Sequence, residues 1–144
     1  MKFLHTMIRI RNIDESLQFF CDGLGLQEFR RKAVEKGRFT LIFLATPEDI
    51  AAYEFPPQIE LTYNWDPEDY TGGRNFGHLA FSVKNIYDTC LHLEQMGVPI
   101  LRPPRDGRMA FIKSPDGISI ELLQEGNALT PQDPWLSQKN QGTW

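Results

Sequence analysis

Cysteines are scarce in this sequence, and long apolar runs are missing altogether. Only two cysteines occur in 144 residues, and both fall at apolar positions of helix-like patterns. We interpret Cys21 and Cys90 as reduced, buried thiols and assign them no chemistry. No window approaches the roughly 18 consecutive apolar residues of a membrane-spanning helix, and the N-terminal MKFLHTMIRI lacks the apolar run of a signal peptide. We therefore expect a cytoplasmic protein without a membrane partner.

The sequence also lacks a basic cluster. Lys and Arg occur only in short runs, and the formal net charge is -4. Because a nucleic-acid partner needs a basic stripe that follows the phosphate backbone, this charge pattern excludes nucleic-acid binding. The content of 41% apolar and 12% aromatic residues is enough to build a core. The length fits one domain, or two small halves that share a core.

The two halves of the chain repeat one another. Residues 5–26, HTMIRIRNIDESLQFFCDGLGL, match residues 78–98, HLAFSVKNIYDTCLHLEQMGV. Each segment opens with an alternating stretch that begins in His and predicts a strand. Each then reaches Asn-Ile, where Asn12 or Asn85 is a predicted helix N-cap with an acidic residue three positions later. A glycine at the matching position then ends each predicted helix.

The repeat continues beyond the helices. RFTLIFLA at 38–45 corresponds to RMAFIKS at 108–114, and QIELTYN at 58–64 corresponds to SIELLQE at 119–125. The first half carries an extra segment, TPEDIAAYEFPPQ, which predicts a loop with one helical turn. The second half makes the same connection with the shorter SPDG. Each half is therefore predicted as a strand, a helix and then two or three strands.

These elements predict an α+β fold built from two βαβββ halves. The halves span about 1–65 and 76–125, and the polar stretch WDPEDYTGGRNF joins them. A two-unit repeat predicts a pseudo-symmetric pair and not a solenoid. We expect the two halves to form a single domain whose curved sheets enclose a site. Residues 126–144 form a C-terminal extension beyond it.

Period-two alternation places polar side chains on one face of the predicted strands. This face carries a histidine on the first strand of each half and a glutamate on the last: His5 and Glu60, then His78 and Glu121. Two imidazoles and two carboxylates suit a divalent transition metal of borderline hardness. The set favours an open catalytic site, since structural zinc prefers thiolate and imidazole ligands.

Four segments resemble signature segments of glyoxalase I (lactoylglutathione lyase), in the vicinal oxygen chelate superfamily: FLHTMIRI, IELTYNW, FGHLAFSV and SPDGISIEL. The resemblance covers roughly residues 2–125, and HTM-x-R together with ELTYNW is specific to glyoxalase I. It implies the βαβββ repeat fold and a homodimer whose metal is held by ligands from both subunits. The ligand positions of that family match His5, Glu60, His78 and Glu121.

The resemblance also implies residues that bind glutathione. The anchors of the family match Arg9 and Asn64, and its arginine four residues before the second His matches Arg74. A further cationic contact falls on Arg102 or Arg105, because the glycine-rich stretch of the family is shortened here to PPRDGRMAFI. An aromatic residue of some members, two positions before the last Glu, is replaced by serine in this chain.

The activity implied by the resemblance is isomerisation of the hemithioacetal of glutathione and methylglyoxal to S-lactoylglutathione. Glu121 is the predicted proton-transfer base, and Glu60 is its counterpart. One divalent metal per site is implied, and the short length of the chain favours Ni²⁺ over Co²⁺ or Zn²⁺. For the two tryptophans of the C-terminal extension, docking near the pocket, docking on the partner subunit and a partly ordered terminus all remain open.

Three other functions remain as alternatives. A relative that epimerises or cleaves another small substrate would keep the fold and the metal without needing Arg9, Asn64 and Arg74 together. An extradiol-type dioxygenase would use two His and one carboxylate, whereas this chain offers four ligands. A metal-free binding protein of the same fold would not need the ligands at all, and a metal analysis distinguishes it.

Overall fold

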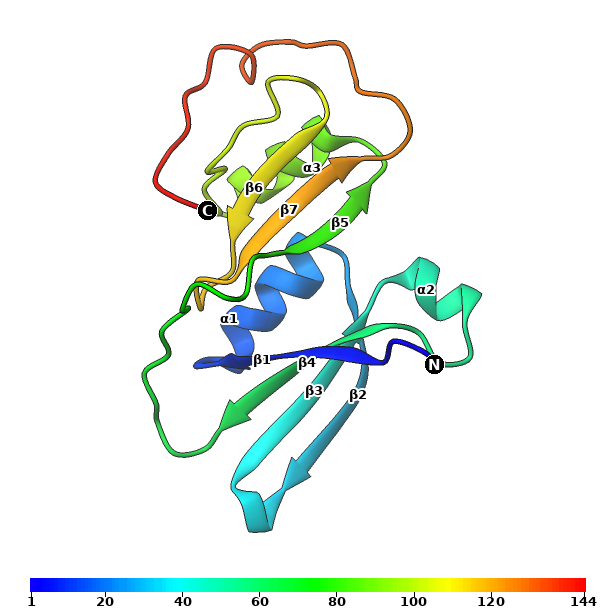
Figure 1. The fold of residues 1–144 in the computed structure, drawn as a ribbon, viewed down its shortest axis with the longest axis vertical. Coiled ribbons are helices and arrows are strands. Elements are labelled where there is room, and N and C mark those ends of the chain that lie inside the picture. Colours follow the sequence, from blue (N-terminus) through cyan, green and yellow to red (C-terminus); the bar gives the residue numbers. More distant parts are fainter. The chain divides into compact units, whose positions relative to one another are not determined.

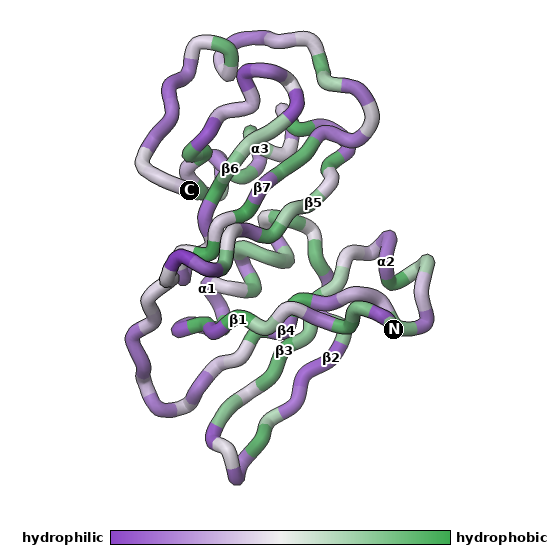
Figure 2. Tube along the Cα trace, in the orientation of Figure 1, coloured by the Kyte–Doolittle hydropathy of each residue, from purple (hydrophilic) through white to green (hydrophobic).

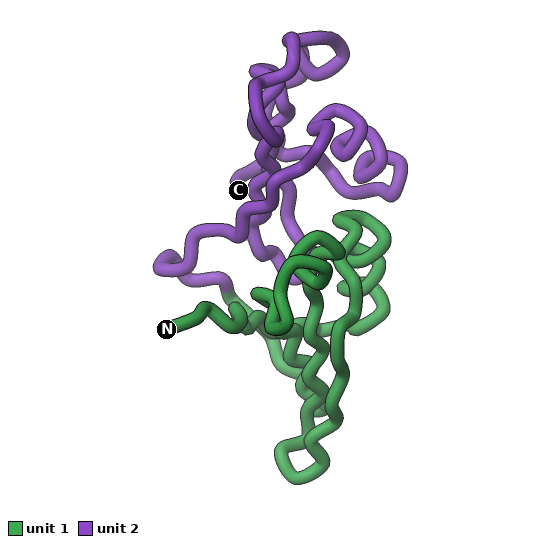
Figure 3. Tube along the Cα trace, turned by 90° about the vertical axis from the view of Figure 1, so that its right-hand side faces the viewer, with its two compact units in different colours: residues 1–71 green, residues 72–144 purple.

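The structure, a computed structural model, describes residues 1–144. The chain divides into two compact units, Met1–Thr71 and Gly72–Trp144 (Figure 3). Each unit contains one β-sheet and the helix that follows its first strand. This architecture confirms the predicted α+β class with its internal repeat. No helix combines the length and the apolar character that crossing a bilayer requires.

The first unit holds a four-stranded sheet with the strand order β1-β4-β3-β2 (Figure 1). Strands β1 and β4 run parallel, and the other neighbours are antiparallel. The elements are β1 His5–Ile10, α1 Ile13–Leu17, the π-helix η1 Gln18–Gly23, β2 Gln27–Val34, the 3₁₀-helix η2 Glu35–Gly37, β3 Phe39–Ala45, α2 Pro47–Ala52 and β4 Gln58–Asn64.

Asn12 caps α1 as predicted, but the bond back from Glu15 goes to the Asn12 side chain and not to its backbone N–H as in a capping box. The Asn12 side-chain oxygen accepts from the Glu15 backbone N–H at 3.1 Å, and the Asn12 amide donates to the Glu15 carboxylate at 3.2 Å. The helix continues as η1 and ends before Gly25, whose φ of +76° suits a residue without Cβ. The predicted helical turn of the extra segment is α2, which Thr46 caps.

The second unit holds a three-stranded sheet with the order β5-β7-β6. Its elements are β5 Leu79–Val83, α3 Ile86–Gln95, β6 Met109–Lys113 and β7 Ser119–Gln124. A fourth strand is reduced to one isolated bridge between Arg102 and Phe111. Pro103 and Pro104 follow directly, and proline has no N–H with which to extend a ladder. The second half is thus a shortened copy of the first.

One face of each sheet is apolar and forms a core with the helices. In the first unit Ile10, Ile42 and Leu61 are almost fully buried together with Phe20 of η1. The second unit has an equivalent core, which contains Ile86, Leu93, Ile112, Ile120 and Leu122. Figure 2 shows β3 as mostly hydrophobic and the segment between β4 and β5 as mostly hydrophilic. The alternation of apolar and polar residues along the strands therefore decides which face of each sheet is buried and which face remains available for a site.

The two cysteines differ in burial. Cys90 of α3 is fully buried, and burial raises the pKa of its thiol to about 12. Cys21 is only partly buried, which corrects the prediction that both thiols lie in a core. It belongs to η1, whose irregular turn buries its neighbours Phe19 and Phe20. Burial also raises the pKa of Cys21, so neither thiol is activated as a nucleophile.

Residues 126–144, which we call the C-terminal strap, pack on their own unit. The Leu129 N–H donates to the Gly107 carbonyl at 3.0 Å, and the Tyr87 hydroxyl donates to the Thr130 carbonyl at 3.0 Å. Trp135 is only 3% exposed. These contacts tie the strap to the second unit.

The strap leaves no room for a side chain at Gly107. A Cβ there would lie 2.0 Å from the Leu129 carbonyl oxygen, and φ is +64°. We expect Gly107→Ala to lower the free energy of unfolding by about 2 to 4 kcal/mol, from backbone strain plus overpacking. Gly117→Ala is the matched control, because its φ is +81° but nothing lies within 4 Å of the added Cβ. It should cost only the strain of about 1 to 2 kcal/mol. Equal losses in urea denaturation would show that the strap contact contributes nothing.

Candidate metal centre

The first unit brings His5 and Glu60 together. His5 Nε2 lies 3.4 Å from Glu60 Oε2, with the two side chains 41% and 14% exposed. The pairing follows from the parallel register of β1 and β4, in which Met7 lies opposite Glu60 and His5 two residues earlier. Side chains two positions apart share a face of a strand. The imidazole therefore reaches diagonally to the carboxylate on the neighbouring strand.

The second unit repeats this arrangement with different residues. His78 Nε2 lies 3.1 Å from Glu121 Oε2, and the side chains are 42% and 16% exposed. Strands β5 and β7 are parallel, and Ala80 lies opposite Glu121, again two residues after the histidine. The two units thus present His–Glu pairs with the same offset, the same atoms and nearly the same exposure.

A phenylalanine supports each histidine, and the sequence analysis missed both. Phe43 lies opposite Glu60 and meets the His5 ring edge-on at 6.1 Å between centroids. Phe111 lies opposite Glu121 and meets the His78 ring edge-on at 5.3 Å. The alignment of the two β-strands from sequence is wrong by two residues, because it matched Leu41 and not Phe43 with Phe111. Only the register against β4 and β7 reveals the correct correspondence.

An arginine lies opposite each of these phenylalanines on the neighbouring segment, but the two arginines make different contacts. Arg30 lies opposite Phe43, and its guanidinium sits 4.0 Å from the centre of that ring. Arg102 lies opposite Phe111, but its guanidinium donates to Asp106 at 2.9 Å and to the Met109 carbonyl. This guanidinium also holds the pKa of the Asp106 carboxyl below its usual value, against the opposing effect of burial.

Trp144 of the C-terminal strap occupies the corresponding place in the second unit. Its indole stacks on Phe111 with 5.8 Å between centroids and 27° between planes. The second unit therefore has a continuous row of aromatic rings: Trp144, Phe111 and His78. Of the locations that the sequence left open for the tryptophans, the structure supports a place near the predicted ligands for Trp144.

The donor chemistry fits a divalent metal, and the donors come in two pairs. Each unit offers one imidazole nitrogen and one carboxylate oxygen on a partly exposed face. Such a mixed set suits a borderline transition ion. Within each unit, no group of three or more His, Cys, Asp or Glu side chains has the spacing of a metal site. Each unit by itself thus offers two of the four predicted ligands.

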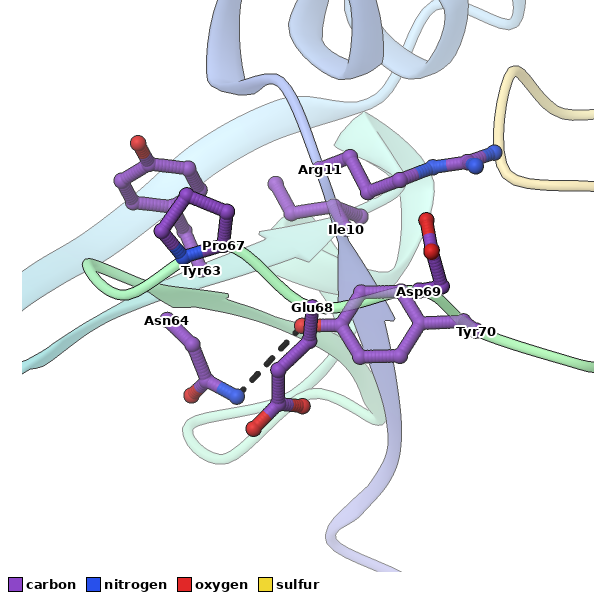
Figure 4. A pocket seen from close by; sticks show the side chains of 8 residues that line it. All are labelled: Ile10, Arg11, Tyr63, Asn64, Pro67, Glu68, Asp69 and Tyr70. Carbon is purple, nitrogen blue, oxygen red and sulfur yellow. Dashed lines mark hydrogen bonds between the residues drawn. The ribbon is translucent and has the colours of Figure 1, made fainter.

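The predicted substrate residues of the first unit follow the same face of the sheet. Arg9 is exposed on β1 and lies opposite Thr62 on β4. Asn64 ends β4 and donates from its amide to the Tyr70 hydroxyl at 3.4 Å. It lines a pocket of about 270 Å³ together with seven residues: Ile10, Arg11, Tyr63, Pro67, Glu68, Asp69 and Tyr70 (Figure 4). The pocket lies at the ends of β1 and β4 that are farther from His5.

The predicted substrate residues of the second unit are less uniform. Arg74 is exposed in the segment before β5. Arg102 bonds within its own loop, whereas Arg105 holds the strap by donating to the Gln138 carbonyl at 2.9 Å and to Asn140 at 2.8 Å. Both guanidinium groups thus have partners in their own unit. The Ser119 hydroxyl, on the face of Glu121, is buried without a hydrogen-bond partner.

Comparison with known proteins assigns the chain to a family. The sequence model of the Glyoxalase/Bleomycin resistance protein/Dioxygenase superfamily matches residues 2–122. A probable lactoylglutathione lyase of Synechocystis sp. is 40% identical over 129 residues, which cover 86% of this chain and 95% of that protein. The lactoylglutathione lyase of Neisseria meningitidis serogroup A is 37% identical over 130 residues, with 87% and 91% covered.

The fold is similar to that of a solved structure with related sequence. The trypanothione-dependent glyoxalase I of Leishmania major superposes with a TM-score of 0.77 at 35% identity, over 87% of both chains. An antibiotic-binding protein of Streptomyces, TnmS3, is similar with a TM-score of 0.65 at 18% identity. The second likeness concerns the fold alone, since its sequence is too distant to carry activity.

Proposed function

The chain belongs to the Glyoxalase/Bleomycin resistance protein/Dioxygenase superfamily, and we propose that it acts as a metal-dependent lactoylglutathione lyase. It isomerises the hemithioacetal of glutathione and methylglyoxal to S-lactoylglutathione. The observation that carries this proposal is the pair of equivalent His–Glu contacts, one in each unit, on the polar faces of their sheets. The names of relatives with up to 40% identity support the same activity.

The proposed site forms in a symmetric dimer. His5 and Glu60 meet His78 and Glu121 of the partner subunit, so two identical sites arise from one two-fold contact. One fact supports this: each chain has one ligand pair in each unit, and neither unit by itself holds a ligand group larger than a pair. The two free cysteines agree with a reducing compartment, and we place the protein in the cytoplasm as part of the proposal.

The ligand residues have unequal tasks in the proposed reaction. When bound, the divalent metal supplies a Lewis acid that stabilises negative charge on the two adjacent oxygens of the substrate. Glu121 removes the proton from one carbon and returns it to the next, so the substrate is isomerised without net oxidation or reduction. Glu60 is the equivalent carboxylate on the other side of the proposed site. The carboxylates are mostly buried, 14% and 16% exposed, which limits the access of bulk water to the proton in transit.

Glutathione carries carboxylates at both ends, and the polar face of the first unit can bind one of them. Arg9 and Asn64 lie along that face, four residues beyond His5 and Glu60 on their respective strands. Arg74, which lies in the second unit, supplies a further cation. The pocket around Asn64 offers hydrogen-bond donors and acceptors for a polar end group.

We expect Arg9→Ala to raise KM for the hemithioacetal with little change in kcat. The lost charge-assisted hydrogen bond corresponds to roughly 1.5 to 3 kcal/mol of binding free energy. Arg31→Ala removes the same charge from β2, where the guanidinium instead pairs with Glu28 at 2.7 Å, and is the matched control. Steady-state kinetics that leave KM unchanged in Arg9→Ala, or raise it equally in both variants, would remove Arg9 from the binding site.

The activity itself is tested on metal-free protein reconstituted separately with Ni²⁺, Co²⁺ and Zn²⁺. We propose Ni²⁺ as the best activator and expect S-lactoylglutathione from glutathione and methylglyoxal with that metal. Replacing glutathione by trypanothione, the thiol named for the Leishmania major enzyme, should lower kcat/KM. Absence of product with every metal would reject the proposal, and absence of bound metal would favour a binding protein of the same fold.

A further inference from the structure

Phe43 and Phe111 are equivalent residues of the two units, but different kinds of side chain cover their rings. In the first unit, Arg30 covers the outer face of Phe43, and Phe43 supports His5. In the second unit, Phe111 supports His78, but the arginine at the matching position, Arg102, has turned to Asp106 and the Met109 carbonyl. Without another residue, one face of Phe111 would be bare.

Trp144 covers that face. Its ring stacks on Phe111 at 5.8 Å and 27°, whereas Phe111 meets His78 edge-on at 5.3 Å and 89°. Stacked and edge-on geometries at these separations are both favourable for aromatic rings. Phe111 is only 8% exposed between its two neighbours. Movement of the Phe111 ring away from His78 would therefore require Trp144 to move as well.

The C-terminal strap is built to deliver Trp144 to this place. Trp135 is buried, and the two hydrogen bonds from Arg105 fix the chain at Gln138 and Asn140. The Gln141 N–H then donates to the Leu101 carbonyl at 2.8 Å, next to the bridge that pairs Arg102 with Phe111. Three residues beyond this anchor, the indole reaches Phe111. The hydrogen bond of Gln141 and the ring contact of Trp144 thus lie at the same edge of the sheet.

We propose that Trp144 is a positioning residue that acts through Phe111 to hold the His78 imidazole in the orientation that binds the metal. This inference rests on the proposed function, because it concerns a ligand of the proposed metal. His78 is 42% exposed, and the contacts that orient its ring are the one with Glu121 and the edge-on packing against Phe111. A ligand held before binding loses less side-chain entropy when the metal arrives. The strap thereby raises the affinity for the metal although it contributes no ligand.

The test compares metal affinity of the dimeric wild type, Trp144→Ala and Trp144→Phe by competition with a chromophoric chelator, using Ni²⁺. We expect Trp144→Ala to bind Ni²⁺ about tenfold more weakly, the lower end of the range for residues that orient a ligand. Trp144→Phe should restore most of the affinity, because a phenyl ring can still stack on Phe111. Leu136→Ala, a half-exposed strap residue, is the control and should bind as the wild type does.

Activity measured against free Ni²⁺ gives a second readout. Trp144→Ala should reach nearly the wild-type plateau at a higher metal concentration, since Trp144 acts on a metal ligand through Phe111 and has no part in the proposed proton transfer. Wild-type affinity in Trp144→Ala would overturn the inference, as would equal weakening in Leu136→Ala. A lowered plateau with an unchanged metal midpoint would also overturn it. A wild type that binds no metal would instead reject the proposed function.

Discussion

Glu121→Gln should retain most of its metal while kcat falls by a factor of about 10² to 10⁴. The amide keeps the size of the carboxylate and one ligating oxygen, but it cannot take a proton from carbon. Glu121 lies opposite Phe111 and beside His78, so the substitution leaves the packing of the pair intact. Metal content by elemental analysis and kcat on the same reconstituted sample separate the two effects.

Glu60→Gln is the matched variant, because Glu60 has the same contact with His5 and nearly the same exposure. It should lose less activity if the two carboxylates have unequal roles. Near-normal turnover of metal-loaded Glu121→Gln would mean that another group moves the proton. A larger loss in Glu60→Gln than in Glu121→Gln would reverse the assignment of base and counterpart.

His78→Ala is expected to lose metal and activity together. Removal of one ligand should weaken metal binding by at least about 100-fold, beyond the effect usual for a residue that merely supports a ligand. It also leaves Glu121 without its partner at 3.1 Å and Phe111 without the ring that it meets edge-on. Calorimetric titration of the metal-free protein with Ni²⁺ measures the affinity directly.

His92→Ala provides the control for this substitution. His92 is the only histidine outside the two pairs and is exposed in the last turn of α3. Its removal should change neither the affinity for Ni²⁺ nor kcat. A His78→Ala protein that binds one metal per site as tightly as His92→Ala does would contradict the ligand assignment.

The local signals of the sequence predicted the framework of the fold well. Asn12 and Asn85 cap the helices where the repeat places them, since a short polar side chain can accept from the free N–H groups of a first turn. Gly25 and Gly97 adopt the positive φ values expected at helix ends, +76° and +82°. The alternation in β1 correctly left His5 and Arg9 on the polar face, with Ile8 buried opposite.

Contacts that depend on register or on distant chain could not be predicted in this way. The roles of Phe43 and Phe111 follow from the residues opposite them in the sheet, and two-residue slips preserve the alternation that the sequence shows. The reduction of the fourth strand of the second unit to a single bridge follows from the two prolines after Arg102, a signal that was present but unused. The contact of Trp144 with Phe111 depends on the path of the strap, which no local pattern specifies.

The central claim is that each active site takes one His–Glu pair from each of two subunits. Coexpression of His5→Ala and His78→Ala chains with different affinity tags tests it, because purification through both tags isolates the mixed dimer. In that dimer one site contains both substitutions and the other contains none. The account predicts that the mixed dimer regains about half of the wild-type lyase activity with Ni²⁺, whereas each parent homodimer is inactive. A mixed dimer as inactive as its parents would contradict a site shared between subunits.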